Sequence, residues 1–143
     1  KAEVAFMEAG NVVVYRFATA FGLSPRLRLD LMINDFTFQA LKNRQLIVFE
    51  KGFRRTFIHV RDMAKAFIHA VENYDLLKDQ AYNVGHESMN YTKEEVAVAI
   101  QNKIDYHLNF NEIETIGSTE EVPVKESCPF DAAKNRIVVL HPG

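Results

Sequence analysis

The chain has 143 residues, 48% of them hydrophobic, which is the size of one ordinary domain with a continuous core. Seventeen basic and nineteen acidic residues give a formal charge of −2, which argues against a nucleic-acid partner or an anionic membrane surface. The single cysteine, Cys128, excludes an internal disulfide, and neither a signal-peptide pattern nor a bilayer-length apolar stretch is present, so we expect a soluble cytoplasmic protein.

The first part of the sequence alternates helical and strand-like patterns. A short helix is expected to end at Gly10, because glycine tolerates the left-handed conformation of many helix ends. Residues 12–17 form a β-branched and aromatic run, typical of a strand buried on both faces of a parallel sheet. A loop is expected through Gly22, and residues 29–43 then carry apolar side chains at the helical period.

The middle of the sequence continues this alternation. Three short segments have the composition of strands: residues 46–49, 56–60 and 81–84. Apolar residues from Asp62 onward again follow the helical period, and Asp62 is expected to cap that helix. Thr92 followed three residues later by Glu95 is a capping box, which predicts the start of a further helix.

Strands alternating with helices predict an α/β fold. The glycine-rich turn between strand and helix that a complete dinucleotide-binding fold requires does not occur in this sequence. The hydrophobic periodicity weakens after residue 110. We therefore expect residues 1–110 to form the ordered portion and residues 111–143 a divergent tail, with a strand at 136–140.

Three motifs follow one another along the chain: Tyr15 to Pro25, Arg54 to Asp62, and Ala81 to Gly85. In order and spacing they resemble motifs of the extended short-chain dehydrogenase/reductases that act as NAD-dependent epimerases and dehydratases of nucleotide sugars. The resemblance implies a partial Rossmann-like sheet plus the small substrate-binding domain of that family, with the cofactor half missing. The portion 1–110 would then be the substrate side of such an enzyme.

The resemblance assigns substrate-binding roles to three residues. Arg55 stands where the family places an arginine against the diphosphate of a nucleotide sugar, and a guanidinium matches phosphate oxygens in a bidentate way. Thr19 stands where asparagine is common in the loop that lines the space between nicotinamide and sugar, and Asn34 is on the next helix. The alternatives are that Arg54 and Arg55 form a solvated pair and that Asn34 faces solvent.

No catalytic, cofactor-binding or metal-binding residue is predicted. In this family a Tyr-x-x-x-Lys pair precedes the strand at 12–17, and if Glu3 is the glutamate that often follows its lysine, the pair falls before residue 1. His59 is expected to be a hydrogen-bonded core residue, since a lone histidine among apolar neighbours usually is. The five histidines are scattered and lack the spacing of metal ligands.

These observations predict the substrate-binding portion of an NAD-dependent nucleotide-sugar epimerase or dehydratase, inactive by itself and without a cofactor of its own, NAD being the cofactor of the complete enzyme. The alternative is a non-catalytic module that binds nucleotide sugars or associates with itself. A homo-oligomer is expected, because apolar surface left bare around residues 12–17 normally finds a partner. The sequence does not indicate which base or sugar is bound.

Overall fold

The structure is a computed structural model that describes residues 1–111 and 137–138 of the chain. The described residues divide into two compact units. Unit 1 contains Lys1–Gly22, Thr56–Met89 and the strand at 137–138, and unit 2 contains Leu23–Arg55 and residues 90–111. Helices and strands alternate in both units, which confirms the predicted α/β class.

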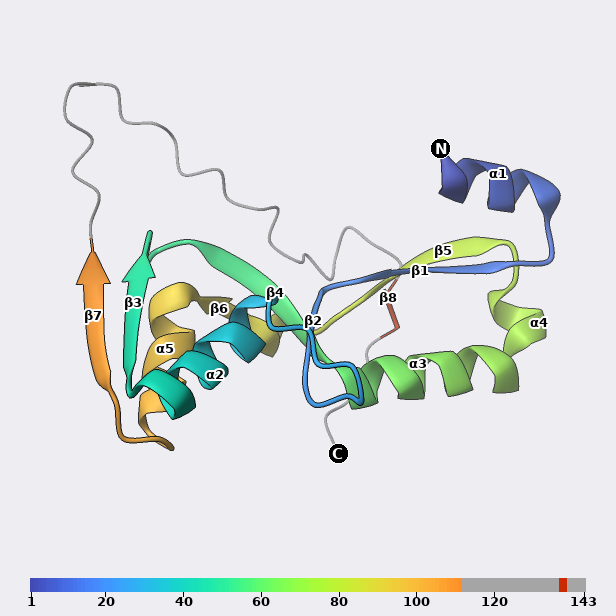
Figure 1. Ribbon diagram of the computed structural model, residues 1–143. Coiled ribbons are helices and arrows are strands. Elements are labelled where there is room, and N and C mark those ends of the chain that lie inside the picture. The colour runs from blue at the N-terminus through green and yellow to red at the C-terminus, as the bar shows by residue number, and fades with distance from the viewer. Residues whose placement is uncertain (112–136, 139–143) are drawn as a thin grey trace, which may run out of the picture. The chain divides into compact units, whose positions relative to one another are not determined.

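Unit 1 is built around parallel strands (Figure 1). Its elements are α1 (Ala2–Ala9), β1 (Val13–Phe17), β2 (Thr19–Phe21), most of β4 (Arg54–His59), α3 (Val60–Glu72), α4 (Tyr74–Leu77), β5 (Gln80–Val84), the short 3-10 helix Glu87–Met89, and β8 (Ile137–Val138). β5 is the middle strand of three, with β1 and β8 parallel to it on its two sides. The carboxyl ends of β1 and β5 are level, because Phe17 is opposite Val84.

The strand β1 is parallel, as predicted, but it is not buried on both faces. Its residues are half-buried and Arg16 is exposed, because β1 is an edge strand in the described part of the sheet. Arg16 forms an ion pair with Glu3 of α1. One cluster of the buried core of this unit contains Ile58, Ala66 and Val84, and the ring of Tyr15 packs against it.

Unit 2 has a smaller sheet covered by two helices (Figure 1). Its elements are α2 (Met32–Asn43), β3 (Gln45–Phe49), the first residues of β4, β6 (Asn90–Thr92), α5 (Lys93–Gln101) and β7 (His107–Asn111). β3 and β7 are parallel, and alternate residues of β3 are buried, which is the period of a strand with one covered face. The core contains Ala40, Leu46, Val48, Ala97 and Tyr106.

The capping box at the start of α5 is confirmed. The backbone N–H of Glu95 donates to the hydroxyl of Thr92 at 3.1 Å, and the backbone N–H of Thr92 donates to the Glu95 carboxylate at 2.6 Å. Two amide groups that a helix start leaves without a partner are thereby satisfied.

Several boundaries differ from the prediction. The helix expected from residue 29 begins at Met32, and the strands β2, β6 and β7 were not predicted, because two of them are only three residues long and β7 contains several polar residues. Of the strand expected at 136–140, residues 137–138 form β8, whereas residues 112–136 and 139–143 of the expected tail lie outside the described residues. Within the described part of the chain, no helix has the length and hydrophobicity needed to cross a membrane.

Candidate functional site

Arg55 lies near the start of β4 with its side chain exposed. The carbon of its guanidinium group is 5.0 Å from the centre of the Phe53 ring, a cation–π contact. The ammonium group of Lys93 lies 5.5 Å from the centre of the same ring. Within residues 1–111, Arg55 has no carboxylate partner, so its N–H donors are open to an anionic ligand.

The neighbouring Arg54 has different surroundings. It donates to the backbone carbonyl of Asn90 at 3.0 Å and lies 3.5 Å from the carboxylate of Glu95. Both side chains of this ion pair are about half exposed, so the pair contributes little to stability. Of the two arginines, Arg54 therefore already has a hydrogen-bond partner and an ion-pair partner within unit 2.

The other two predicted substrate residues lie in different units. Thr19 belongs to unit 1, where it is half-buried at the start of β2 and opposite Phe57 of β4. Among the described residues, its hydroxyl has no hydrogen-bond partner. Asn34 belongs to unit 2, where its amide donates to the carbonyl of Arg28 at 3.0 Å and so ties down the start of α2.

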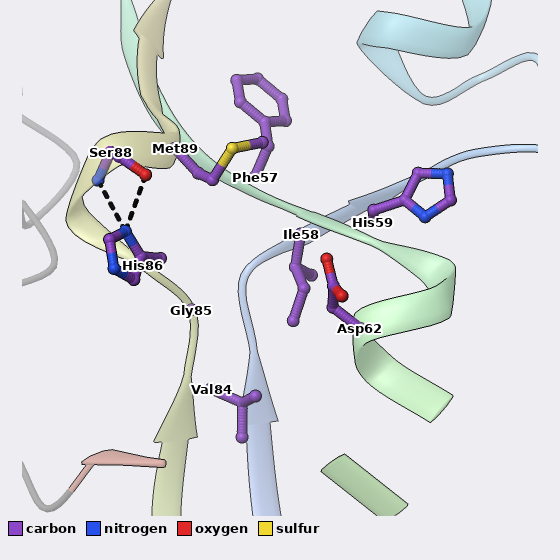
Figure 2. A pocket seen from close by; sticks show the side chains of 9 residues that line it. All are labelled: Phe57, Ile58, His59, Asp62, Val84, Gly85, His86, Ser88 and Met89. Carbon is purple, nitrogen blue, oxygen red and sulfur yellow. Dashed lines mark hydrogen bonds between the residues drawn. The ribbon is translucent and has the colours of Figure 1, made fainter. Parts of the chain in front are cut away.

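Unit 1 contains a pocket at the carboxyl end of β5 and the start of α3, shown in Figure 2. It is lined by Phe57, Ile58, His59, Asp62, Val84, Gly85, His86, Ser88 and Met89. Its volume of about 60 Å³ holds a few water molecules or a small polar group. The pocket therefore has room for one small group of a larger ligand.

Two polar residues of this pocket are joined to each other on the loop after β5 (Figure 2). Nδ1 of His86 is 2.7 Å from the hydroxyl of Ser88 and 3.1 Å from the backbone N–H of Ser88. An N–H can only donate, so Nδ1 is the acceptor, and the neutral His86 ring carries its proton on Nε2. His86 is thus a donor through Nε2.

The start of α3 corrects one sequence interpretation. Asp62 was expected to cap this helix, but the helix begins at Val60 and His59 is the N-cap, with its Nδ1 accepting from the backbone N–H of Arg61 at 3.2 Å. Asp62 lies within the first turn, where a carboxylate is favoured by the helix dipole, and pairs with Lys65 at 3.1 Å. The reason is that β4 pairs with β2 as far as His59, which fixes where the strand ends.

Other titratable groups are explained by the fold. Hydrogen bonding from the Thr92 backbone lowers the pKa of Glu95, while burial raises the pKa of Tyr15, whose hydroxyl donates to the carbonyl of Ala66 at 3.1 Å. In the described ranges, no three histidine, cysteine or acidic side chains are close enough to hold a metal ion.

One Tyr-x-x-x-Lys spacing does occur in the sequence, at Tyr74 and Lys78. It lies after the strand that the family's catalytic pair precedes. The hydroxyl of Tyr74 donates to the carbonyl of Asn11 at 2.6 Å, and Lys78 is 3.0 Å from the carboxylate of Asp75. These contacts give both residues a structural role.

Comparison with known proteins agrees with this arrangement of motifs. The sequence model of the NAD dependent epimerase/dehydratase family matches residues 2–85, more than half of the chain. The chain belongs to the NAD-dependent epimerase/dehydratase family. The match includes Thr19, Asn34 and Arg55 but ends at Gly85, before the His86 and Ser88 pair.

Solved structures show the same partial Rossmann-like fold. The ADP-L-glycero-D-manno-heptose-6-epimerase of Helicobacter pylori is 19% identical, with a TM-score of 0.55 over 68% of this chain and 32% of the enzyme. The UDP-glucose 4-epimerase of Thermus thermophilus in complex with NAD is 20% identical, with a TM-score of 0.51 over the same shares. MoeE5 in complex with UDP-glucose and NAD is 20% identical, with a TM-score of 0.53, again over 68% and 32%. The chain thus spans about a third of these epimerase/dehydratase structures.

Sequence reasoning missed several residues of these sites. His86 and Ser88 carry no recognisable spacing, and only their position directly after the strand that ends at Val84 could have indicated them, since ligands of α/β proteins bind beyond the carboxyl ends of strands. Phe53 precedes Arg55 by two residues on the same side of the chain, so alternation along a strand could have suggested their contact.

Proposed function

We propose that this chain is the substrate-binding portion of an NAD-dependent nucleotide-sugar epimerase or dehydratase of the cytoplasm, and that Arg55 binds the diphosphate of the substrate. Family membership supports the class of enzyme. The substrate follows from the family and from relatives such as MoeE5, which was solved with UDP-glucose. Thr19 and Asn34 are the further proposed substrate contacts.

The contrast between the two arginines carries the assignment of Arg55. Arg54 is held by Glu95 and by the carbonyl of Asn90, whereas Arg55 is stacked on Phe53 without a carboxylate partner in residues 1–111. The cation–π contact with Phe53 restricts the guanidinium, whose N–H groups have no carboxylate partner in residues 1–111. A restricted guanidinium loses less conformational entropy when it binds a phosphate.

Inorganic pyrophosphate tests this assignment without a choice of base or sugar. Calorimetric titration should show that Arg55→Ala weakens binding by about 1.5–3 kcal/mol, the range for a hydrogen bond to a charged group. Arg55→Lys should recover only part of the affinity, because an ammonium cannot make the two parallel contacts. Arg54→Ala is the matched control and should lose much less. Equal losses for the two alanine variants would remove the support for Arg55.

The residues do not fit a resident NAD. The described part of the chain has no glycine-rich turn, and the single Tyr-x-x-x-Lys spacing is bonded within the fold, so no step of the reaction is assigned to these residues. We expect the chain by itself neither to bind NAD nor to turn over a nucleotide sugar. A saturable NAD titration with a dissociation constant below about 100 μM, or about −5.5 kcal/mol, would contradict this.

A self-associating module is the second candidate, and the exposed apolar residues of α3 favour it. Val71 is 79% exposed and Ile68 is 57% exposed, although both are apolar and lie one turn apart on the same helix. On α1 of the same unit, Phe6 is 61% exposed. Such surface normally binds a partner. Light scattering should show a homo-oligomer at high concentration, and Val71→Glu should shift it toward the monomer, whereas a monomeric wild type would exclude this candidate.

A further inference from the structure

The side chain of His59 connects the segment that carries Thr19 with the start of α3. On one side, the ring of His59 packs edge-on against the ring of Phe21, with 5.2 Å between the ring centres. These two residues are also opposite each other in the parallel pairing of β2 and β4. The same ring therefore lies against the end of the strand that begins at Thr19.

The contact between His59 and Gly22 is closer still. A methyl group added to Gly22 would lie 2.8 Å from Nε2 of His59 and 2.9 Å from Cγ2 of Val60, both too close for unbonded atoms. Gly22 also has a φ of +126°, which side chains rarely tolerate. The backbone at Gly22 is thus packed directly against the imidazole.

The opposite edge of the imidazole holds the helix. Nδ1 of His59 accepts from the backbone N–H of Arg61, so one ring satisfies the start of α3 and supports the β2 segment at the same time. An aspartate or serine could cap the helix equally well. Neither has a ring to reach Phe21 and Gly22, so capping alone does not explain the histidine.

We propose that His59 is a positioning residue, which holds β2 through Phe21 and Gly22 so that the hydroxyl of Thr19 is presented to the ligand. This inference rests on the proposed function only for the role of Thr19 in substrate binding. The mechanical part, that the imidazole holds β2, stands on the contacts of His59 alone.

Amide hydrogen exchange separates the two halves of this side chain. His59→Asn keeps an acceptor for the cap and removes the ring, so exchange at residues 20–22 should become about tenfold faster, equivalent to about 1.4 kcal/mol of local opening, while the first turn of α3 is unchanged. His59→Phe keeps a ring and removes the acceptor. Exchange should then become faster in the first turn of α3 and stay unchanged at residues 20–22. Phe21→Leu reduces the same ring contact with the cap intact, and it decides the question should His59→Asn unfold. Unchanged exchange at residues 20–22 in both His59→Asn and Phe21→Leu would overturn the proposal.

Binding of UDP-glucose tests the link to Thr19. Thr19→Val and His59→Asn should each weaken binding. The double variant should bind UDP-glucose as tightly as the single variant with the larger loss of affinity, because both substitutions act through one hydroxyl. Independent, additive losses would overturn the link, since they are what a merely structural effect of His59 produces. Absence of UDP-glucose binding by the wild type would count against the proposed function, and the exchange experiment would still decide whether His59 holds β2.

Discussion

The helices α3 and α5 begin in different ways. At α5, Thr92 and Glu95 satisfy the free amide groups with side chains that belong to the helix start itself. At α3, the cap is His59, the last residue of β4, and the carboxylate of Asp62 turns to Lys65 instead. The start of α5 is determined by residues within four positions of each other. The start of α3 is determined by the pairing of two strands, in which Phe21 is opposite His59, 38 positions further along the chain.

This difference separates what local chemistry can determine from what tertiary contacts determine. A capping box uses only short-range hydrogen bonds, so its sequence signature is sufficient. His59 can cap α3 only because β2 holds β4 in a strand up to that residue. We therefore expect loss of the backbone pairing between β2 and β4 to damage α3, whereas loss of the ring contact between Phe21 and His59 alone leaves the α3 cap intact. Substitutions in the capping box should damage α5 alone.

The largest effect is expected at Gly22. Gly22→Ala should lower the free energy of unfolding of unit 1 by about 2–4 kcal/mol, because it adds backbone strain to a collision with His59 and Val60. Urea unfolding followed by circular dichroism measures the loss. The control is Gly52→Ala in the turn before β4, where an added methyl meets nothing within 4 Å, and which should change stability by less than about 1 kcal/mol. Similar losses in both variants would contradict the packing of Gly22 against the imidazole.

The next effect concerns the capping box. Thr92→Ala should destabilise α5 by about 1 kcal/mol, since Glu95 loses the acceptor of its backbone N–H. Exchange of the α5 amides should accelerate while that of α3 is unchanged. Thr37→Ala is the control: this hydroxyl donates to the carbonyl of Ile33 inside α2, where alanine is the better helix former. If Thr92→Ala accelerated amide exchange in α3 as much as in α5, the start of α5 would not be determined by local residues alone.

The sequence predicted the fold where apolar periodicity or capping residues were strong. The period of residues 29–43 gave α2, and the alternation of strands and helices gave the α/β class. It failed at β2 and β6, whose three residues pair only because β4 lies beside them. It also overestimated the burial of β1, since the number of neighbouring strands cannot be derived from the residues of one strand.

The candidate site was predictable only through family motifs. Arg54 and Arg55 are adjacent and chemically identical, and sequence alone offered the same solvated role for both. The contacts that distinguish them come from Phe53, Asn90 and Glu95, two of which are more than thirty residues away along the chain. The role of Arg55 as a phosphate ligand remains a prediction that pyrophosphate binding tests.

A smaller effect is expected from acid. The pKa of Glu95 is lowered in the folded state, chiefly by the backbone N–H of Thr92, from its usual value of 4.5. Stability from this carboxylate is therefore fully present above the unfolded-state pKa and is lost as pH falls through the folded-state pKa. Glu95→Gln keeps a capping-box acceptor. When the pH is lowered below 4.5, α5 should lose less stability in this variant than in the wild type. Glu94→Gln, whose side chain makes no bond in the described residues, should retain the wild-type pH dependence.

The smallest effect tests whether Arg54 belongs to α5 and Arg55 does not. Arg54 lies 3.5 Å from Glu95 and contributes only the minor part of the lowering of its pKa. Arg54→Ala should therefore raise the pKa of Glu95 slightly, measured by NMR titration of its carboxyl carbon, and change stability by less than about 1 kcal/mol because the pair is half exposed. Arg55→Ala is the control and should leave the Glu95 titration unchanged, since its guanidinium stacks on Phe53. If Arg55→Ala shifts the titration as much as Arg54→Ala does, both arginines serve the start of α5, and the contrast that assigns Arg55 to a ligand is lost.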